Sequence, residues 1–151
     1  EIDACKKVED GFVVPANYNT VGQIVISGEE DAVLKAGEFA KEAGAKKVSV
    51  LNTAGPFHTS KLIDCSSKLK EELDKTQINT KNSKVVKNID GTTYTENDNV
   101  ADILSKHIMN PVRFTTCLKN MYDNGIDTFI EVGPGKTLSA FVKRMKFEKR
   151  V

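Results

Sequence analysis

His58 and His107 are the only two histidines in the 151-residue chain, and His58 has the better setting for chemistry. It stands in the segment AGPFHTS, where the Gly-Pro pair favours a sharp turn and a polar helix is expected to begin at Thr59 or Ser60. The positive end of a helix dipole disfavours an imidazolium, so a ring held there stays neutral and able to accept a proton near neutral pH. His58 is therefore a candidate general base, and a purely structural histidine fits the same pattern.

A base of this kind needs a nucleophile to activate, and the usual one in an α/β fold is a serine in a G-x-S-x-G turn. None of the serines in this chain has flanking glycines at that spacing. Either His58 is not part of a catalytic pair, or its serine lies on a segment upstream of Glu1. The missing starter Met and the missing first strand of the N-terminal unit favour the second interpretation.

Two further segments contain residue types that occur in ligand-binding loops. Asn17 and Asn19, in PANYNTVGQ, either line a polar pocket with their amides or only bond the local backbone. The VGPGK loop at 132–136 lacks the spacing of the glycine-rich phosphate-binding motifs, and Pro134 has no N–H to donate. That loop therefore indicates a structural turn.

The elements that must position these residues alternate between helices and strands. The pattern predicts a helix end at 2–8, an extended stretch at 12–19, a strand at 23–27, a helix at 29–43 ending at Gly44, and a strand at 47–51. This order is that of a split βαβ unit lacking its first strand.

After His58 the pattern predicts a helix at 60–75, a hairpin with a two-residue type I′ turn at Asp90-Gly91, and a helix at 100–107 that stops before Pro111. A helix from about 114 to 124, a strand at 128–132, a GPG turn and a last helix follow. The final strand, turn and helix are typical of an α/β protein.

Composition narrows the class of partner. The 22 basic and 21 acidic residues leave a net charge of +1 without a concentrated patch, so we expect neither nucleic-acid nor membrane binding, and no apolar run is long enough to span a bilayer. Cys5, Cys65 and Cys117 are widely spaced, which argues against a disulfide framework and a metal site. We predict three buried thiols in a cytoplasmic protein.

Four motifs in one order resemble a single family. The segments PANYNTVGQIVISG, AGAKKVSVLNTAGPFHTS, MNPVRF and FIEVGPGKTLSAFVKR are similar to the C-terminal half of bacterial malonyl-CoA:acyl carrier protein transacylases, over nearly the whole chain. The resemblance implies an α/β-hydrolase-like large lobe interrupted by a ferredoxin-like small lobe. Residues 1–54 would then form most of the small lobe, and residues 55–151 the C-terminal part of the large lobe.

The same resemblance implies a mechanism and its partners. In the family a serine on a G-H-S-x-G turn attacks the malonyl-CoA thioester and the histidine of the PFH motif, here His58, takes its proton; the acyl-serine then passes malonyl to the phosphopantetheine thiol of acyl carrier protein. The implied partners are malonyl-CoA or coenzyme A, acyl carrier protein, and an N-terminal segment of the same enzyme that holds the serine. No further cofactor is implied, and the pathway is fatty acid biosynthesis. Phe57 resembles the pattern of malonyl-selecting members.

One position departs from the family pattern. Many members have a glutamine where this chain has His107, near the active site, and its main chain there helps to orient the catalytic imidazole. His107 is therefore a further candidate binding residue, although a surface histidine at a helix end fits too. Two alternatives remain at this stage, a polyketide synthase acyltransferase domain and a non-catalytic module that binds a carrier protein.

Overall fold

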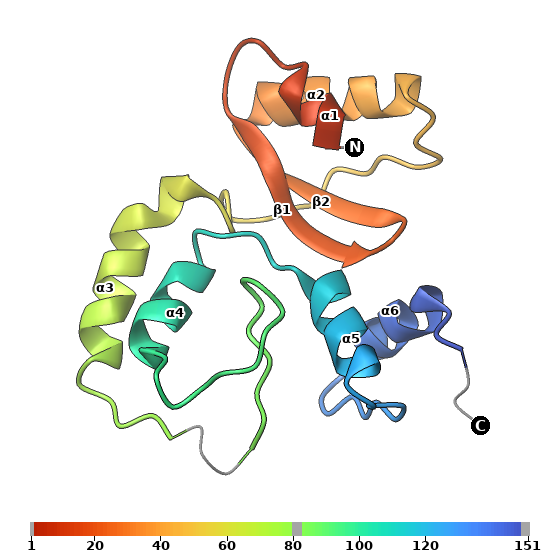
Figure 1. The fold of residues 1–151 in the computed structure, drawn as a ribbon. Coiled ribbons are helices and arrows are strands. Elements are labelled where there is room, and N and C mark those ends of the chain that lie inside the picture. The colour runs from red at the N-terminus through yellow and green to blue at the C-terminus, as the bar shows by residue number, and fades with distance from the viewer. Residues whose placement is uncertain (1, 80–82, 149–151) are drawn as a thin grey trace.

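The computed structural model describes residues 2–79 and 83–148. In chain order the elements are α1 (Ile2–Lys6), β1 (Val13–Thr20), β2 (Gln23–Gly28), α2 (Glu30–Glu42), the short 3-10 helix η1 (Ser60–Leu62), α3 (Ile63–Leu73), α4 (Val100–His107), α5 (Phe114–Asp123) and α6 (Thr137–Met145). Figure 1 shows two parts: α1, α2 and the β1–β2 hairpin lie together, and the pairs α3–α4 and α5–α6 lie below the hairpin.

The N-terminal part has its own small core. β1 and β2 pair antiparallel, from Val13 opposite Gly28 to Thr20 opposite Gln23. Both strands and the long helix are confirmed where the sequence predicted them, and α2 is followed by Gly44, whose φ of +92° suits glycine. The buried core residues come from α1, β1 and α2: Cys5, Val13, Ala32 and Ala36.

The two remaining predicted strands, at 47–51 and 128–132, are not part of any sheet in the described residues. A strand is stable only when a neighbour pairs with its backbone, and no described segment pairs with either one. Their apolar side chains are consequently uncovered, with Val50 74%, Ile130 83% and Val132 94% exposed. The split βαβ prediction is therefore wrong for its last strand, and the prediction of a strand at 128–132 is wrong too.

Within 128–132 the side chains still alternate between two environments. Phe129 and Glu131 are half-buried, whereas Ile130 and Val132 are exposed. The Glu131 carboxylate accepts the N–H groups of Leu138 and Ser139 at 3.1 and 2.9 Å, so it holds the first turn of α6. One face of this segment is thus fixed by α6, and the other face is exposed to solvent.

The hairpin predicted at Asp90-Gly91 forms, but with a longer turn. Val86 pairs with Thr93 across it, and the Gly91 N–H donates to the carbonyl of Lys87 at 2.8 Å. Gly91 alone of the turn residues has a positive φ, +78°, whereas a type I′ turn needs two such residues. The two-residue turn was therefore wrong, and a four-residue loop at 88–91 replaces it.

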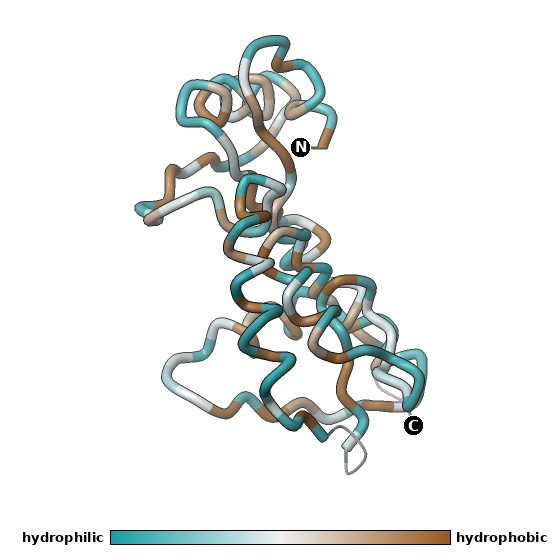
Figure 2. Tube along the Cα trace, turned by 90° about the vertical axis from the view of Figure 1, so that its left-hand side faces the viewer, coloured by the Kyte–Doolittle hydropathy of each residue, from teal (hydrophilic) through white to brown (hydrophobic). Residues whose placement is uncertain are grey.

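The other helices are close to their predicted positions. α4 begins after Asn99, whose side chain accepts the N–H of Asp102 at 3.0 Å, and α5 buries Cys117 and Leu118 as expected. Cys65 is exposed on α3, which corrects the prediction of three buried thiols; the buried residue on that helix is Ser66. Figure 2 shows hydrophobic stretches spread along both parts of the chain instead of gathered in one centre.

Candidate active site

His58 lies in a tight turn between residues 47–54, which are exposed to solvent, and η1. Its φ is +60°, a left-handed conformation that few non-glycine residues adopt and that histidine tolerates better than most. Two hydrogen bonds hold the residue in place. Its backbone N–H donates to the carbonyl of Ile108, and its Nδ1 lies against the carbonyl of His107, both at 3.0 Å.

The contact at Nδ1 determines which ring nitrogen is available. A carbonyl oxygen can only accept, so Nδ1 must carry the proton in this hydrogen bond. In the neutral ring Nε2 then has the free lone pair. The arrangement presents Nε2 of His58 as a proton acceptor, which is what a general base requires.

Thr59 fixes the turn from the other side. It is 1% exposed, its hydroxyl donates to the carbonyl of Pro56 at 2.7 Å, and the same oxygen accepts the N–H of Lys61 at 3.3 Å. Thr59 is thus the N-cap of η1, and it is one of the two residues, with Ser60, at which the sequence predicted a helix to begin. Because the cap bonds both sides of His58, the imidazole projects from a rigid turn.

Residues 107–113, which we call the connector, carry the carbonyl groups that hold His58. At its far end the Val112 N–H donates to Ala16 and the Val112 carbonyl accepts from Tyr18, both at 2.8 Å. Val112 therefore pairs in parallel with Asn17 of β1. The structure brings Asn17 to the same backbone element that supports His58.

The remaining predicted binding residues have different positions. Asn19 is half-buried two residues further along β1. Phe57 directly precedes His58 and is 52% exposed, and its N–H donates to the carbonyl of Gly55 at 2.9 Å. About half of the Phe57 side chain is thus open to solvent.

His107 contributes its carbonyl, and its ring is enclosed. Nε2 of His107 is buried without a hydrogen-bond partner among the described residues. Burial lowers the pKa of His107, and the nearby His58 lowers it further, against the opposing charge of Asp90. The lowered pKa favours the neutral form of the His107 ring.

Sequence reasoning missed two supports of the His58 turn. One is the carbonyl of Ile108, which carries no sequence signal because any residue supplies a carbonyl. The other is an ion pair from the N-terminal part, between Glu29 and Lys61 at 3.0 Å, with the Lys61 ammonium 5.2 Å from the centre of the Phe12 ring. The hydrogen bond from Lys61 lowers the pKa of the Glu29 carboxyl, with a further contribution from the Phe12 N–H.

Three further features of the described residues concern other kinds of site. They contain no group of three or more His, Cys, Asp or Glu side chains that could hold a metal ion. A pocket of about 420 Å³ near the C-terminal end of α6 is lined by Tyr122, Phe129, Phe147 and neighbouring residues, and includes none of the predicted site residues. Within residues 2–79 and 83–148, no helix has the length and apolar character needed to cross a bilayer.

Comparisons with known proteins show the family to which the chain belongs. The acyl transferase domain family matches residues 2–149. The malonyl CoA-acyl carrier protein transacylases of Bacillus subtilis and Escherichia coli K12 are 40% and 38% identical over 93% and 94% of this chain. The crystal structure of the Clostridium perfringens transacylase is 44% identical with a TM-score of 0.90 over 95% of the chain.

A second solved structure is a malonyl-transacylase in complex with a type II PKS acyl-carrier protein, at 32% identity and a TM-score of 0.90 over 96% of this chain. The chain spans about half the length of the proteins it matches, 44% and 46% of the two curated relatives and 46% and 47% of the two solved chains. These solved structures are α/β proteins, and the likeness extends over almost every described element. The chain therefore belongs to the acyl transferase domain family and is homologous to malonyl CoA-acyl carrier protein transacylases.

Proposed function

We propose that this chain supplies the general base of a malonyl-CoA:acyl carrier protein transacylase, and that the base is His58. The observation that carries the proposal is the hydrogen bond between Nδ1 of His58 and the carbonyl of His107, which leaves Nε2 free to accept a proton. The similarity to malonyl CoA-acyl carrier protein transacylases supports the identity of the substrates.

In the proposed mechanism the nucleophile is a serine on a segment outside these 151 residues. Nε2 of His58 removes the hydroxyl proton as the serine oxygen attacks the malonyl thioester, and then gives that proton to the departing thiolate of coenzyme A. In the second half His58 removes the proton of the phosphopantetheine thiol as the thiol attacks the acyl-serine. The proton finally returns to the serine oxygen, so both halves use one base.

The fold supports a shared site of this kind. We propose that residues 1–54 form most of a ferredoxin-like small lobe and that residues 55–151 form the C-terminal part of an α/β-hydrolase-like large lobe. Exposed Val50, Ile130 and Val132 support this proposal, because uncovered β-branched side chains are suited to burial in a sheet completed by another segment. The segment that brings the serine would cover them.

Acyl carrier protein and malonyl-CoA are the proposed partners, and the cytoplasm is the proposed location. One solved relative is a malonyl-transacylase in complex with an acyl-carrier protein, which supports a carrier protein as acceptor here. Phe57 and Asn17 are proposed to contact the acyl or pantetheine group. Phe57 directly precedes His58 in its turn, and Asn17 pairs with Val112 of the connector. Asn19 and His107 are proposed to help shape the same site.

The proposal is tested by His58→Ala in the full-length transacylase that carries this chain. Without a base the serine attacks as a neutral hydroxyl and the thiolate leaves unprotonated, so single-turnover acylation by malonyl-CoA should slow by about 10²–10⁴-fold. The dissociation constant for malonyl-CoA should change far less, because the imidazole acts on the reacting proton.

A matched control is Ser67→Ala, which removes a hydroxyl from the exposed face of α3. It should leave both measurements unchanged. Acylation of the folded His58→Ala variant at the parent rate would show that His58 is structural and would overturn the proposed mechanism. Circular dichroism and the melting temperature of the variant establish that it is folded.

A further inference from the structure

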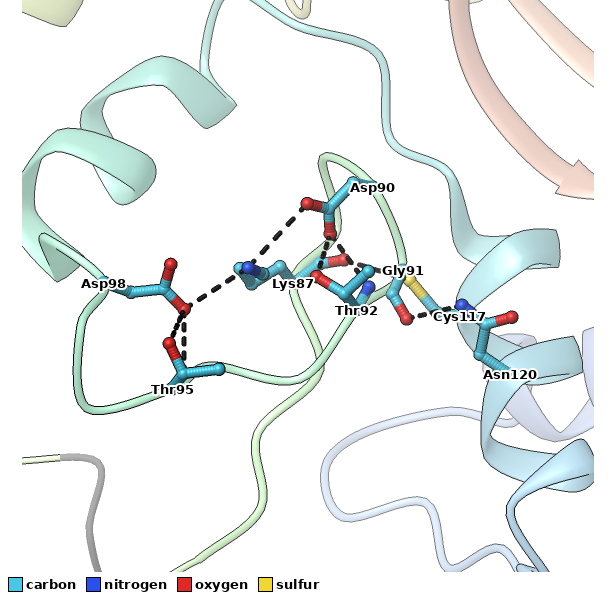
Figure 3. Close-up of polar contacts among 8 residues, drawn as sticks. All are labelled: Lys87, Asp90, Gly91, Thr92, Thr95, Asp98, Cys117 and Asn120. Atoms are coloured by element: carbon cyan, nitrogen blue, oxygen red, sulfur yellow. Dashed lines mark hydrogen bonds and ion pairs between the residues drawn. The ribbon is translucent and has the colours of Figure 1, made fainter.

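Lys87 is buried, which is rare for lysine: its side chain is 10% exposed. Its ammonium nitrogen lies 3.3 Å from a carboxylate oxygen of Asp98, 3.8 Å from one of Asp90, and 5.7 Å from the ring centre of Tyr94. Figure 3 shows the ammonium between the two carboxylates. A buried charge is stable only when it is paired, and the carboxylates of Asp98 and Asp90 supply that pairing here.

Each of the two carboxylates is also held in orientation by hydrogen bonds from a nearby threonine. Asp98 accepts the backbone N–H of Thr95 at 2.7 Å and its hydroxyl at 3.2 Å. Asp90 accepts the N–H and the hydroxyl of Thr92, both at 2.8 Å. Both carboxyl groups therefore have fixed directions, and Lys87 joins the turn of the hairpin at 88–91 to the segment that leads into α4 (Figure 3).

The same hairpin is bonded to α5. The Lys87 carbonyl accepts the thiol of Cys117 at 3.4 Å, and the Asn120 amide donates to the carbonyl of Gly91 at 2.9 Å. The hairpin packs closely against α5 at Gly91, because an added Cβ there would lie 2.8 Å from Cγ2 of Thr116. The hairpin and α5 thus form one rigid unit.

This unit holds the connector at the end opposite His58. The Arg113 N–H donates to the carbonyl of Asn88 at 2.8 Å, directly after Lys87 in the hairpin. Six residues earlier the connector begins at His107, whose carbonyl bonds to Nδ1 of His58, and Ile108 holds the His58 backbone. A displacement of the hairpin would therefore move the carbonyl groups that orient the imidazole.

We propose that Lys87 is a positioning residue for the acyl-transfer reaction: its ion pairs with Asp90 and Asp98 fix the hairpin turn to the segment that leads into α4, and the hairpin, which is also bonded to α5, fixes the connector that orients His58. Lys87 touches neither substrate nor the reacting atoms in this proposal. The expected change in the acylation rate rests on the proposed function. The expected change in the orientation of the His58 ring rests only on the hydrogen bonds described above.

The test compares Lys87→Met with Lys119→Met in the full-length transacylase. Both changes remove one ammonium group and keep a long unbranched side chain, but Lys119 pairs with Asp123 at 2.6 Å on the exposed face of α5. We expect Lys87→Met to slow single-turnover acylation by roughly tenfold, the scale of a small misplacement of a catalytic group, and to change the malonyl-CoA dissociation constant by less than about twofold. Lys119→Met should match the parent.

A spectroscopic readout separates positioning from general stability. Nitrogen NMR of the His58 ring should show the Nδ1-protonated tautomer in the parent and in Lys119→Met, and a mixture of tautomers in Lys87→Met. Lys87→Arg keeps the charge and should restore both the rate and the spectrum. If Lys87→Met does not fold, Asp98→Asn removes the partner charge with almost no change of shape, and the same two effects are expected.

A folded Lys87→Met or Asp98→Asn variant with the parent rate and the parent His58 spectrum would overturn the proposal. Failure of the proposed function gives a different result. In that case the parent has no transfer activity, and the His58 spectrum still decides whether Lys87 positions the ring.

Discussion

At the scale of single residues, the left-handed backbone of His58 explains why so many contacts surround it. A non-glycine residue at a φ of +60° costs about 1–3 kcal/mol, so the neighbouring structure must hold it there. The carbonyl groups of His107 and Ile108 and the cap at Thr59 provide that support. Such strain at the residue proposed to transfer the proton agrees with a site that is organised before substrate binds.

His107→Gln tests how much of this depends on the second imidazole. The lowered pKa of His107 means that the unfolded chain binds a proton near the ordinary value of 6.5 while the folded chain resists it. His107 therefore favours folding above about pH 6.5 and loses that contribution as the pH falls below it. Urea unfolding from pH 7.5 to 5.5 should show a shallower loss of stability for His107→Gln than for the parent.

The same variant should retain most of its acyl-transfer rate, with a loss below about tenfold, because a glutamine at 107 keeps the carbonyl that bonds His58. Single-turnover acylation at pH 7.5 measures this. A larger loss in a folded variant would assign the imidazole of His107 a role of its own, and an unchanged pH dependence of stability would show that its ring titrates freely.

At the scale of elements, the hairpin at 85–94 depends on one glycine. Gly91 has a φ of +78°, and an added Cβ would meet the side chain and backbone of Thr116 at 2.8 and 3.1 Å. We expect Gly91→Ala to lower the free energy of unfolding by about 1–3 kcal/mol, through backbone strain and the close contact with α5.

Gly22→Ala is the matched control, because a Cβ there has nothing within 4 Å and the residue has no positive φ. Chemical denaturation followed by circular dichroism compares the two. Equal stability of Gly91→Ala and the parent would mean that the hairpin and α5 can separate without cost, which would also weaken the positioning role of Lys87.

The elements show what sequence reasoning can and cannot reach. Caps and periodic apolar faces are local signals, so β1, β2, α2, α4 and α5 could be predicted from the sequence. The strands predicted at 47–51 and 128–132 have the right residue types, but pairing is a non-local property and no described segment provides it. The turn at 88–91 differs from the prediction because contacts from α5 fix Gly91.

The site divides in the same way. His58 could be found from its place after a Gly-Pro turn, and Thr59 from its capping chemistry. The partners of His58 could not be derived from the residues alone, because they are main-chain carbonyl groups 49 and 50 residues away along the chain. The burial of Lys87 had no sequence signal either, since lysine is normally a surface residue.

At the scale of the whole molecule, several polar contacts join the N-terminal part to the helices below it. β1 reaches the connector at Val112, Glu29 reaches Lys61, and Gln23 accepts Arg144 of α6 at 2.6 Å. Both the Glu29–Lys61 pair and the Gln23–Arg144 bond are exposed and are therefore weak individually. The His58 turn lies at this junction, so a movement of one part relative to the other would displace the imidazole ring.

The uncovered segment at 128–132 has a consequence for the behaviour of this chain in solution. Its outer face carries Ile130 and Val132, two exposed side chains of high β propensity, which favours edge-to-edge association between copies. We expect the chain alone to self-associate as its concentration rises. Val132→Lys should suppress this association, because it places a charge on the exposed apolar face of residues 128–132. Val21→Lys, at a turn position that is 80% exposed, adds the same charge elsewhere and should not. Sedimentation velocity across a concentration series distinguishes the two variants, and equal behaviour would mean that association, if any, uses another surface.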